Sequence, residues 1–285
     1  MSNNFSSNVF AEAFKRTAMH YIQNLELPEF PPAPRTTTST TTAATTAATA
    51  TTTATTTATT VDTVSKIDTA TCINDRMLQS FAAGLTVQQK SDVLNSTLLA
   101  QLAANKAYPT DTTGKYDVSG WYSKFSEVLL NLGWISQNTF FKNYQMSGKS
   151  FTVDKALLEI LTGLLEQNSL LLAKAAISAL NDLPSTDNKF TLFNFNTCSD
   201  QMGNLSLGVC TESNGTVDYS FAAMYLETSK KIKQILFVDF STSEFKLYAG
   251  TNTITLNSDV YGIVREEVVK KLNNMAAAYI SALEI

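Results

Sequence analysis

The sequence predicts an α+β fold, with a helical N-terminal half packed on a C-terminal antiparallel β-meander that a C-terminal helix closes. Three observations support this prediction. Apolar residues recur at helical spacing as far as Pro184, the spacing then alternates as it does in strands, and helical spacing returns from Asp259. The connections between the expected strands are short, and short connections join antiparallel neighbours.

Residues 1–27 are expected to form an amphipathic helix. Its apolar stripe includes Phe10, Phe14, Tyr21 and Ile22. A single helix of this length is marginally stable in water, so the stripe is expected to dock on another surface. That surface is either the chain's own body or a protein partner, for which the helix would act as a detachable recognition or delivery arm. A helix on a membrane surface is disfavoured, because few basic residues are present.

Residues 28–60 are expected to form a linker. Prolines recur from Pro28 to Pro34, and residues 36–60 contain 17 Thr, 7 Ala and 1 Ser. These side chains offer no large apolar surface to offset the entropy of ordering the backbone, about 1–2 kcal/mol per residue. A flat Thr/Ala surface that binds water or other chains is the less favoured alternative. The sequence therefore divides into an arm (1–27), a linker (28–60) and a single globular α+β domain (61–285).

Five helices are expected in the globular domain. A capping box of Thr86 and Gln89 opens the second, Gly133 ends the third, and Pro184 ends the fourth. The expected ranges are 75–83, 86–105, 119–133, 154–183 and 259–283. The fourth has a polar interruption near Asn168, and residues 134–146 fit either a strand or a loop.

Six strands are expected between the fourth and fifth helices. Their ranges are 189–195, 204–210, 216–226, 231–240, 245–248 and 253–256. Gly, Asn, Asp and Ser residues separate them. Asn214-Gly215 is the strongest hairpin signal, because both residues tolerate the positive φ angles of a two-residue turn.

The charge and histidine content exclude several function classes. With 21 Lys+Arg against 25 Asp+Glu, the net charge is -4, so no nucleic-acid partner is expected. The one histidine, His20, precedes the linker, which removes histidine-based triads and two-histidine metal sites from the domain. No catalytic residue, cofactor or metal site is therefore predicted, and an enzyme is the less favoured class.

Three residues remain of chemical interest. Cys198 and Cys210 fall near the ends of two expected neighbouring strands and would bridge in an oxidising compartment, but three cysteines without a signal peptide favour reduced thiols. Lipid attachment to either thiol stays open, although no motif supports it. Asp239 is the best carboxylate for a histidine-free hydrolase, because alternation places it beside Ile235 and Phe237. A strand end that faces solvent is nevertheless the favoured interpretation.

The favoured function is a non-enzymatic interaction protein, an exported effector or toxin-like virulence cargo whose N-terminal helix binds a protein partner. A carboxylate-dependent hydrolase and a membrane-active, pore-forming protein are the alternatives. The Leu-rich segment 156–183 motivates the latter, but a core helix is favoured, and no transmembrane span is expected because polar residues interrupt the segment. Peripheral membrane or lipid contact stays open. Without a recognisable secretory signal, the chain is expected to be soluble, and cytoplasmic or exported by a route that is independent of signal peptides.

Overall fold

The computed structural model describes residues 3–28, 70–112, 114–135, 141–144 and 149–282. The expected linker lies outside these residues, apart from Pro28. The helices are α1 (Asn3–Asn24), α2 (Val87–Ala107), α3 (Val118–Asn131), α4 (Val153–Thr162), α5 (Gln167–Asn181), α6 (Asn188–Thr197), α7 (Ser258–Gly262) and α8 (Arg265–Ala282). The strands are β1 (Ala70–Asn74), β2 (Met77–Phe81), β3 (Trp134–Ile135), β4 (Lys142–Asn143), β5 (Ser150–Phe151), β6 (Cys198–Ser199), β7 (Met202–Ser213), β8 (Thr216–Thr228), β9 (Phe240–Ser241) and β10 (Phe245–Asn257).

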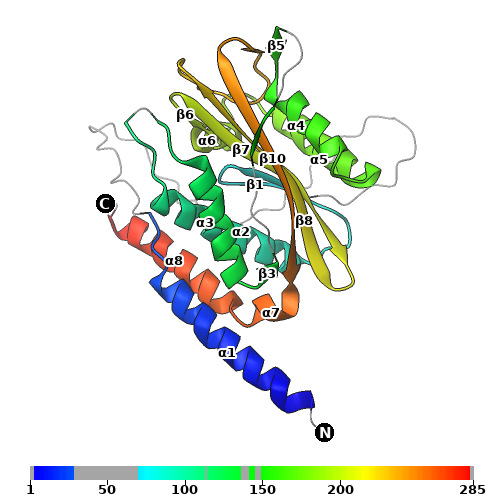
Figure 1. Cartoon of the computed structure of the whole chain (residues 1–285), viewed down its shortest axis with the longest axis vertical. Helices are drawn as coiled ribbons and strands as arrows, with labels where there is room; N and C mark the ends of the chain where they lie inside the picture. The colour runs from blue at the N-terminus through cyan, green and yellow to red at the C-terminus, as the bar shows by residue number, and fades with distance from the viewer. Residues whose placement is uncertain (1–2, 29–69, 113, 136–140, 145–148, 283–285) are drawn as a thin grey trace, which may run out of the picture.

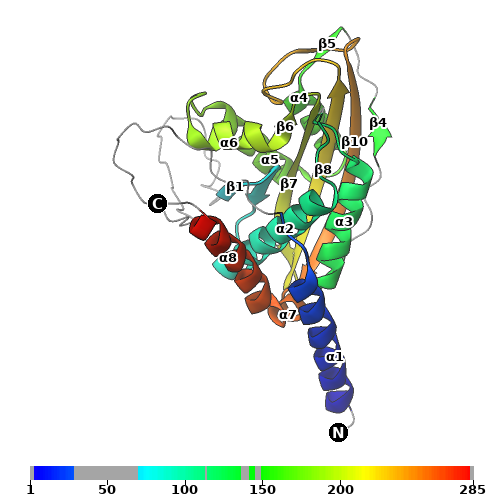
Figure 2. The same cartoon turned by 90° about the vertical axis from the view of Figure 1, so that its left-hand side faces the viewer.

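A large sheet with helices on both faces forms the body (Figures 1 and 2). Its strand order is β1-β2-β7-β8-β10-β3, with β4 also paired to β10 and β6 to β7, whereas β5 and β9 form a separate small sheet. Helices come before the main strands and α7 and α8 follow them. This is the α+β architecture that the sequence predicts.

Two apolar cores lie on opposite faces of the sheet, because successive strand residues point to opposite faces. Val209 belongs to one core and the next residue, Cys210, to the other. The core that contains Cys210 joins α1, α2, α3, α7 and α8 to the sheet. The core that contains Val209 joins α4, α5 and α6 to it.

The C-terminal half of α1 docks on the body. Ala18, Ile22 and Leu25 are buried in the core that α2 and α3 share. Lys271 Nζ of α8 donates a hydrogen bond to the carbonyl oxygen of Gln23 at 3.0 Å. The N-terminal half of α1 extends beyond the rest of the body (Figures 1 and 2). Of the two docking surfaces that the sequence left open, the chain's own body is therefore the one occupied in this structure.

The clearest local signals of the sequence are found in the structure. Thr86 and Gln89 form a capping box at the start of α2, with each side chain bonded to the other residue's backbone N–H. Asn214 and Gly215 take φ angles of 52° and 82° and join β7 to β8 in a two-residue turn. These signals are reliable because they depend on residues close together in the chain.

Residues 75–83, expected to be helical, contain the turn and second strand of the β1–β2 hairpin instead. Asp75 takes a φ of 55°, which allows the tight turn between the two strands. All five residues of β2 are buried. A strand buried on both faces has no alternation to read, so the spacing of its apolar residues suggested a helix.

Residues 189–195, expected to be a strand, form most of helix α6. Asp187 Oδ1 accepts a hydrogen bond from the backbone N–H of Lys189 and caps the helix. Phe190 and Phe193 are both buried, one helical turn apart. Aromatic residues are so frequent in this segment that they match both helical and alternating spacing. The Asp187 cap is the signal that favours a helix.

The sheet is mixed where an all-antiparallel meander was expected. Strand β2 runs parallel to β7, while β7, β8 and β10 pair antiparallel. A parallel pair needs a long crossover, and the chain from α2 to α6 provides it between β2 and β7. The prediction missed this pair because it placed no strand ahead of the helices.

Four further elements differ from those expected. Residues 231–240 are mostly irregular, with β9 at their end, and the two short strands expected in 245–256 are one strand, β10. The long fourth helix divides into α4 and α5 around Gly163, and the last helix divides into α7 and α8. In the part of the chain that the structure describes, no helix combines the length and apolarity required to cross a membrane.

Candidate functional site

The α2–α3 side of the sheet is held by buried hydrogen bonds between side chains. Asn74 Nδ2, at the end of β1, lies 2.9 Å from Gln79 Oε1 and 2.9 Å from Thr97 Oγ1 of α2. Gln101 Nε2 donates to the carbonyl oxygen of Asn74 at 3.0 Å. All four side chains are buried. Because unpaired buried polar groups are costly, this network fixes the orientation of α2 on the β1–β2 hairpin.

Arg76 extends the network towards α3. Its guanidinium lies 5.4 Å from the ring centre of Tyr116 and 5.1 Å from that of Trp121, and Nη2 donates to Asn105 Oδ1 at 3.1 Å. Burial acts to lower the pKa of Arg76, but Tyr116 and Asp75 beside it raise the pKa above its ordinary value. The guanidinium is therefore a permanent charge held between aromatic rings.

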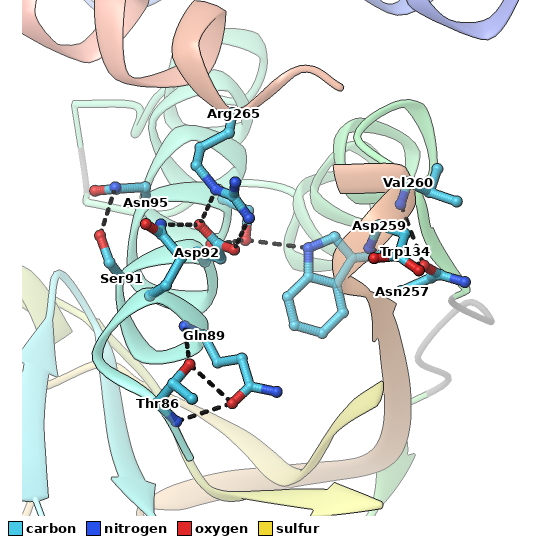
Figure 3. A network of polar contacts seen from close by, with 12 residues as sticks. Thr86, Gln89, Ser91, Asp92, Asn95, Trp134, Asn257, Asp259, Val260 and Arg265 are labelled. Carbon is cyan, nitrogen blue, oxygen red and sulfur yellow. Dashed lines mark hydrogen bonds and ion pairs between the residues drawn. The ribbon is translucent and has the colours of Figure 1, made fainter. Parts of the chain in front are cut away.

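A charged pair joins α8 to α2 (Figure 3). Arg265 Nε and Nη2 donate to the two carboxylate oxygens of Asp92 at 2.8 and 2.7 Å. The hydrogen bonds to Asp92 raise the pKa of Arg265. Ser96 Oγ donates to the Asp92 carbonyl and accepts from Trp134 Nε1, which extends the contacts to β3. Bidentate pairs of this kind fix orientation as well as distance.

A shallow groove of about 550 Å³ opens beside this pair. Its walls mix opposite charges and amides, with one valine, and consist of Gln88, Arg265, Glu266, Val269, Lys270, Asn273 and Asn274. The described residues contain no group of three or more His, Cys, Asp or Glu side chains that could hold a metal ion. The groove therefore indicates no particular cofactor or reaction.

The α4–α5 side of the sheet differs, because its contacts are apolar. Leu157, Leu161 and Ala173 are fully buried against the sheet. Within the described residues, no side chain of α4 or α5 hydrogen-bonds to β2, β7 or β8, the strands below them, although Tyr144 donates to Glu159 of α4 from the segment after β4. Neither helix has a side-chain cap at its N-terminus. We call α4 and α5 the apolar layer, and α2 and α3 the locked layer.

The sheet face below the apolar layer is itself apolar. Leu205 pairs with Met224 and Leu207 with Ala222 across β7 and β8, and Leu226 pairs with Leu247 across β8 and β10. These residues and Val209 are all buried. The strands are long, with 12 residues in β7 and 13 in each of β8 and β10. The apolar layer thus covers a broad hydrocarbon surface.

The two thiols singled out in the sequence lie far apart. Cys198 pairs with Gly203 across β6 and β7, whereas Cys210 is seven residues further along β7, a distance of about 23 Å at about 3.3 Å per residue. Both are free cysteines. Burial raises the pKa of Cys198 to about 11 and that of Cys210 well above its ordinary value. Such thiols carry little reactive thiolate near neutral pH.

Asp239 is exposed in the irregular segment before β9. The strand alternation that placed it beside Ile235 and Phe237 is absent, since Phe237 takes a φ of 63°. Among the described residues, Asp239 belongs to no group of three or more His, Cys, Asp or Glu side chains.

The arm residues occupy different environments. Ile22 is buried, and Tyr21 donates to Glu127 Oε1 of α3 at 2.9 Å. Phe14 is half-buried and packs against the core that contains Cys210. The backbone of Phe10 is helical, but its side chain lies outside the described residues.

Sequence reasoning missed the locked layer's polar network. Its members come from four separate segments and form no motif: Asn74, Gln79, Thr97, Gln101, Asn105, Tyr116 and Asn204. A usable signal did exist, because polar residues interrupt faces that are otherwise apolar in β2, α2 and β7. Such interruptions indicate buried polar contacts without naming the partners.

Comparisons with known proteins find matches among solved structures only. No protein-family model and no curated protein sequence matches the chain. Among solved structures, the activated Cyt2Ba monomer from Bacillus thuringiensis subsp. israelensis is 11% identical, with a TM-score of 0.39 over 65% of this chain and 98% of that one. A delta-endotoxin is 8% identical, with a TM-score of 0.32 over 65% and 82%. The Evf virulence factor is 14% identical, with a TM-score of 0.29 over 70% and 76%. At these scores the likeness carries no functional conclusion.

Proposed function

We propose that this chain is a non-enzymatic, toxin-like protein that acts on a lipid membrane, and that lipid displaces its apolar layer. The observation that carries this proposal is the apolar packing of α4 and α5, whose Leu157, Leu161 and Ala173 are buried against an apolar face of the sheet. Apolar contacts have no preferred direction. Acyl chains are as apolar as leucine, so they can replace the contacts of these helices with the sheet at little cost.

The locked layer makes the opposite contribution. Separating α2 from the sheet would break the contacts of Thr97 with Asn74 and Gln79 and the hydrogen bond from Gln101 to the Asn74 carbonyl. Each unpaired group in an apolar medium costs about 1–3 kcal/mol. Lipid offers no replacement for these bonds, so the locked layer is expected to stay on the sheet. The proposed opening is thus confined to one face.

Vesicle experiments test this proposal. Protein is added to dye-filled phosphatidylcholine vesicles, with and without phosphatidylglycerol, near neutral pH and in mild acid. We expect dye release, together with hydrogen exchange that is at least tenfold faster in α4 and α5 and unchanged in α2 and α3. Retained dye with full protection of α4 and α5 under every condition would contradict the proposal, and so would earlier opening of α2 and α3.

The arm belongs to the same proposal, as the part that reaches a protein partner during delivery. Its support is the N-terminal half of α1, which extends past the body (Figure 2). Because Ile22 and Leu25 are buried, removing residues 1–60 is expected to lower stability by at most about 3–5 kcal/mol. The remaining domain should still unfold cooperatively on heating. Loss of the cooperative transition would show that the arm is part of the domain.

No observation favours the hydrolase as a second function. Asp239 is exposed in an irregular segment, where the strand alternation that suggested it is absent.

A further inference from the structure

Helix α6 presents an exposed apolar ridge. Phe195 is 79% exposed and Leu192 is 54% exposed. They are three residues apart, so they lie side by side on one helix face. Phe190 and Phe193 on the opposite face are buried in the core that contains the apolar layer. The helix is thus held firmly on the body while its outer face shows two large apolar side chains to solvent.

Three lysines lie in the loop beside the end of α6. Lys230, Lys231 and Lys233 are exposed, and the buried Ile232 between them anchors the loop. The loop reaches the α6 end through Asp200, whose carbonyl oxygen accepts from the Ile232 N–H at 2.6 Å. Asp200 follows Phe195 by five residues. The lysine loop therefore contacts the chain just after the end of α6.

These lysines are available to other anions. Lys231 lies 2.8 Å from the carboxylate of Asp200, and Lys230 pairs with Glu244. All the side chains in both pairs are at least 40% exposed. Exposed ion pairs contribute about 1 kcal/mol or less, so competing anions can break them.

We propose that the α6 ridge and the three lysines form the surface by which the protein first contacts an anionic lipid bilayer. This inference rests on the proposed membrane function and adds the docking site to it. Phe195 and Leu192 would enter the boundary between headgroups and acyl chains, and the lysines would lie among the lipid phosphates. Since α6 shares its core with α4 and α5, docking here would bring lipid to the apolar layer.

Co-sedimentation with vesicles of phosphatidylcholine and phosphatidylglycerol tests the surface. The double variant Phe195→Ser with Leu192→Ser should bind at least tenfold more weakly, because both apolar side chains leave the interface. The control Val87→Ser with Ile135→Ser removes residues that are 85% and 68% exposed elsewhere on the body, and should bind like the wild type. All four sites are exposed, so the variants are expected to keep the wild-type melting temperature.

The lysines are tested in the same assay. Lys230→Gln with Lys233→Gln should weaken binding to phosphatidylglycerol vesicles by roughly fivefold per lysine and should leave pure phosphatidylcholine unaffected. Lys270→Gln on α8, also a well exposed lysine, is the control and should have no effect. Added salt should reduce the difference between the variants.

The outcomes separate this inference from the proposed function. If the wild type binds and releases dye while the α6 variants match it, the docking surface is wrong and the membrane function stands. If the wild type does not bind vesicles at all, both are wrong. If Phe195→Ser instead reduces self-association measured without lipid, the ridge is a contact between copies and the lipid inference fails.

Discussion

The two layers that cover the sheet bury similar apolar side chains but differ in their polar contacts. In the locked layer, Asn74, Gln101 and Tyr122 take part in buried hydrogen bonds that join helix to strand. In the apolar layer, the contacts with the large sheet are apolar, and the hydrogen bond that Glu159 of α4 accepts comes from Tyr144 in the segment after β4. The locked side is therefore held by buried hydrogen bonds as well as by burial, and the apolar side mainly by burial.

This difference shows that the stability of a layer on the sheet and the specificity of its position have different sources. Burial of apolar surface stabilises both layers in water, because it is non-directional and scales with area. Buried hydrogen bonds add specificity, since moving the helix leaves their groups unpaired. A change of solvent from water to lipid removes the stabilisation from apolar burial and strengthens the buried hydrogen bonds. The same fold can therefore be rigid in water on both sides and open in lipid on one.

The largest expected effects come from a matched pair of leucine truncations. Leu99 in the locked layer and Leu157 in the apolar layer are both fully buried. Leu99→Ala and Leu157→Ala should each lower the free energy of unfolding by about 2–5 kcal/mol in urea titrations. With vesicles they should differ, since Leu157→Ala loosens the layer that lipid displaces and should lower the protein concentration for half-maximal dye release.

The comparison must be made at equal stability. Adding urea to the more stable variant until the two unfolding free energies match removes the general effect of destabilisation. If dye release is then the same for both variants, the two layers open alike and the distinction between them fails.

A smaller effect is expected from removing one polar contact of the locked layer. Asn74→Ala leaves Gln79 and Thr97 buried with fewer partners and should cost about 1–3 kcal/mol in unfolding free energy. The control is Thr162→Ala in α4, whose exposed hydroxyl bonds within its own helix and should change stability by about 0.5 kcal/mol or less. Equal costs at the two positions would mean that the buried network adds no stability.

Much of the fold could be predicted from the sequence because its signals are local. The capping box at Thr86 and the turn at Asn214-Gly215 each depend on two neighbouring residues. Strand β2 was predicted as a helix, because burial on both faces leaves it without alternation. Helix α6 was predicted as a strand, because its closely spaced aromatic residues resemble alternation. The parallel β2–β7 pair joins residues far apart in the chain, which short-range spacing does not report.

The candidate site was harder to predict than the fold. Asn74 and Asn204 act in one region of the body but lie 130 residues apart, and neither belongs to a motif. The residues that did attract attention, Cys198, Cys210 and Asp239, were chosen for their chemistry and lie in separate places. The sequence shows that segment 156–183 is apolar, but only the structure shows that its contacts with the sheet are apolar as well.

The smallest expected effect concerns the contact between Tyr21 of α1 and Glu127 of α3 in the locked layer. Burial acts to raise the pKa of Glu127, but hydrogen bonds from Lys124 and Tyr21 bring the pKa below its ordinary value of 4.5. A carboxylate whose pKa is lower in the folded state stabilises that state above its unfolded pKa, and the stabilisation is lost as pH falls through the folded value. The side chain of Glu127 is 50% exposed, so the contribution should be below about 1 kcal/mol.

Urea midpoints measured from about pH 6 down to about pH 3 test this contribution, because the range spans the ordinary titration of glutamate. The wild type should lose slightly more stability over this range than Glu127→Gln, which cannot titrate. Tyr21→Phe removes one of the two hydrogen bonds and should fall between them. Because Tyr21 lies in the C-terminal half of α1, the protection of its backbone amides, relative to the intrinsic exchange rate at each pH, should fall together with this loss. An identical pH dependence in the wild type and Glu127→Gln would show that the contact between Tyr21 and Glu127 does not help to hold α1, which would leave burial of Ile22 and Leu25 as its attachment.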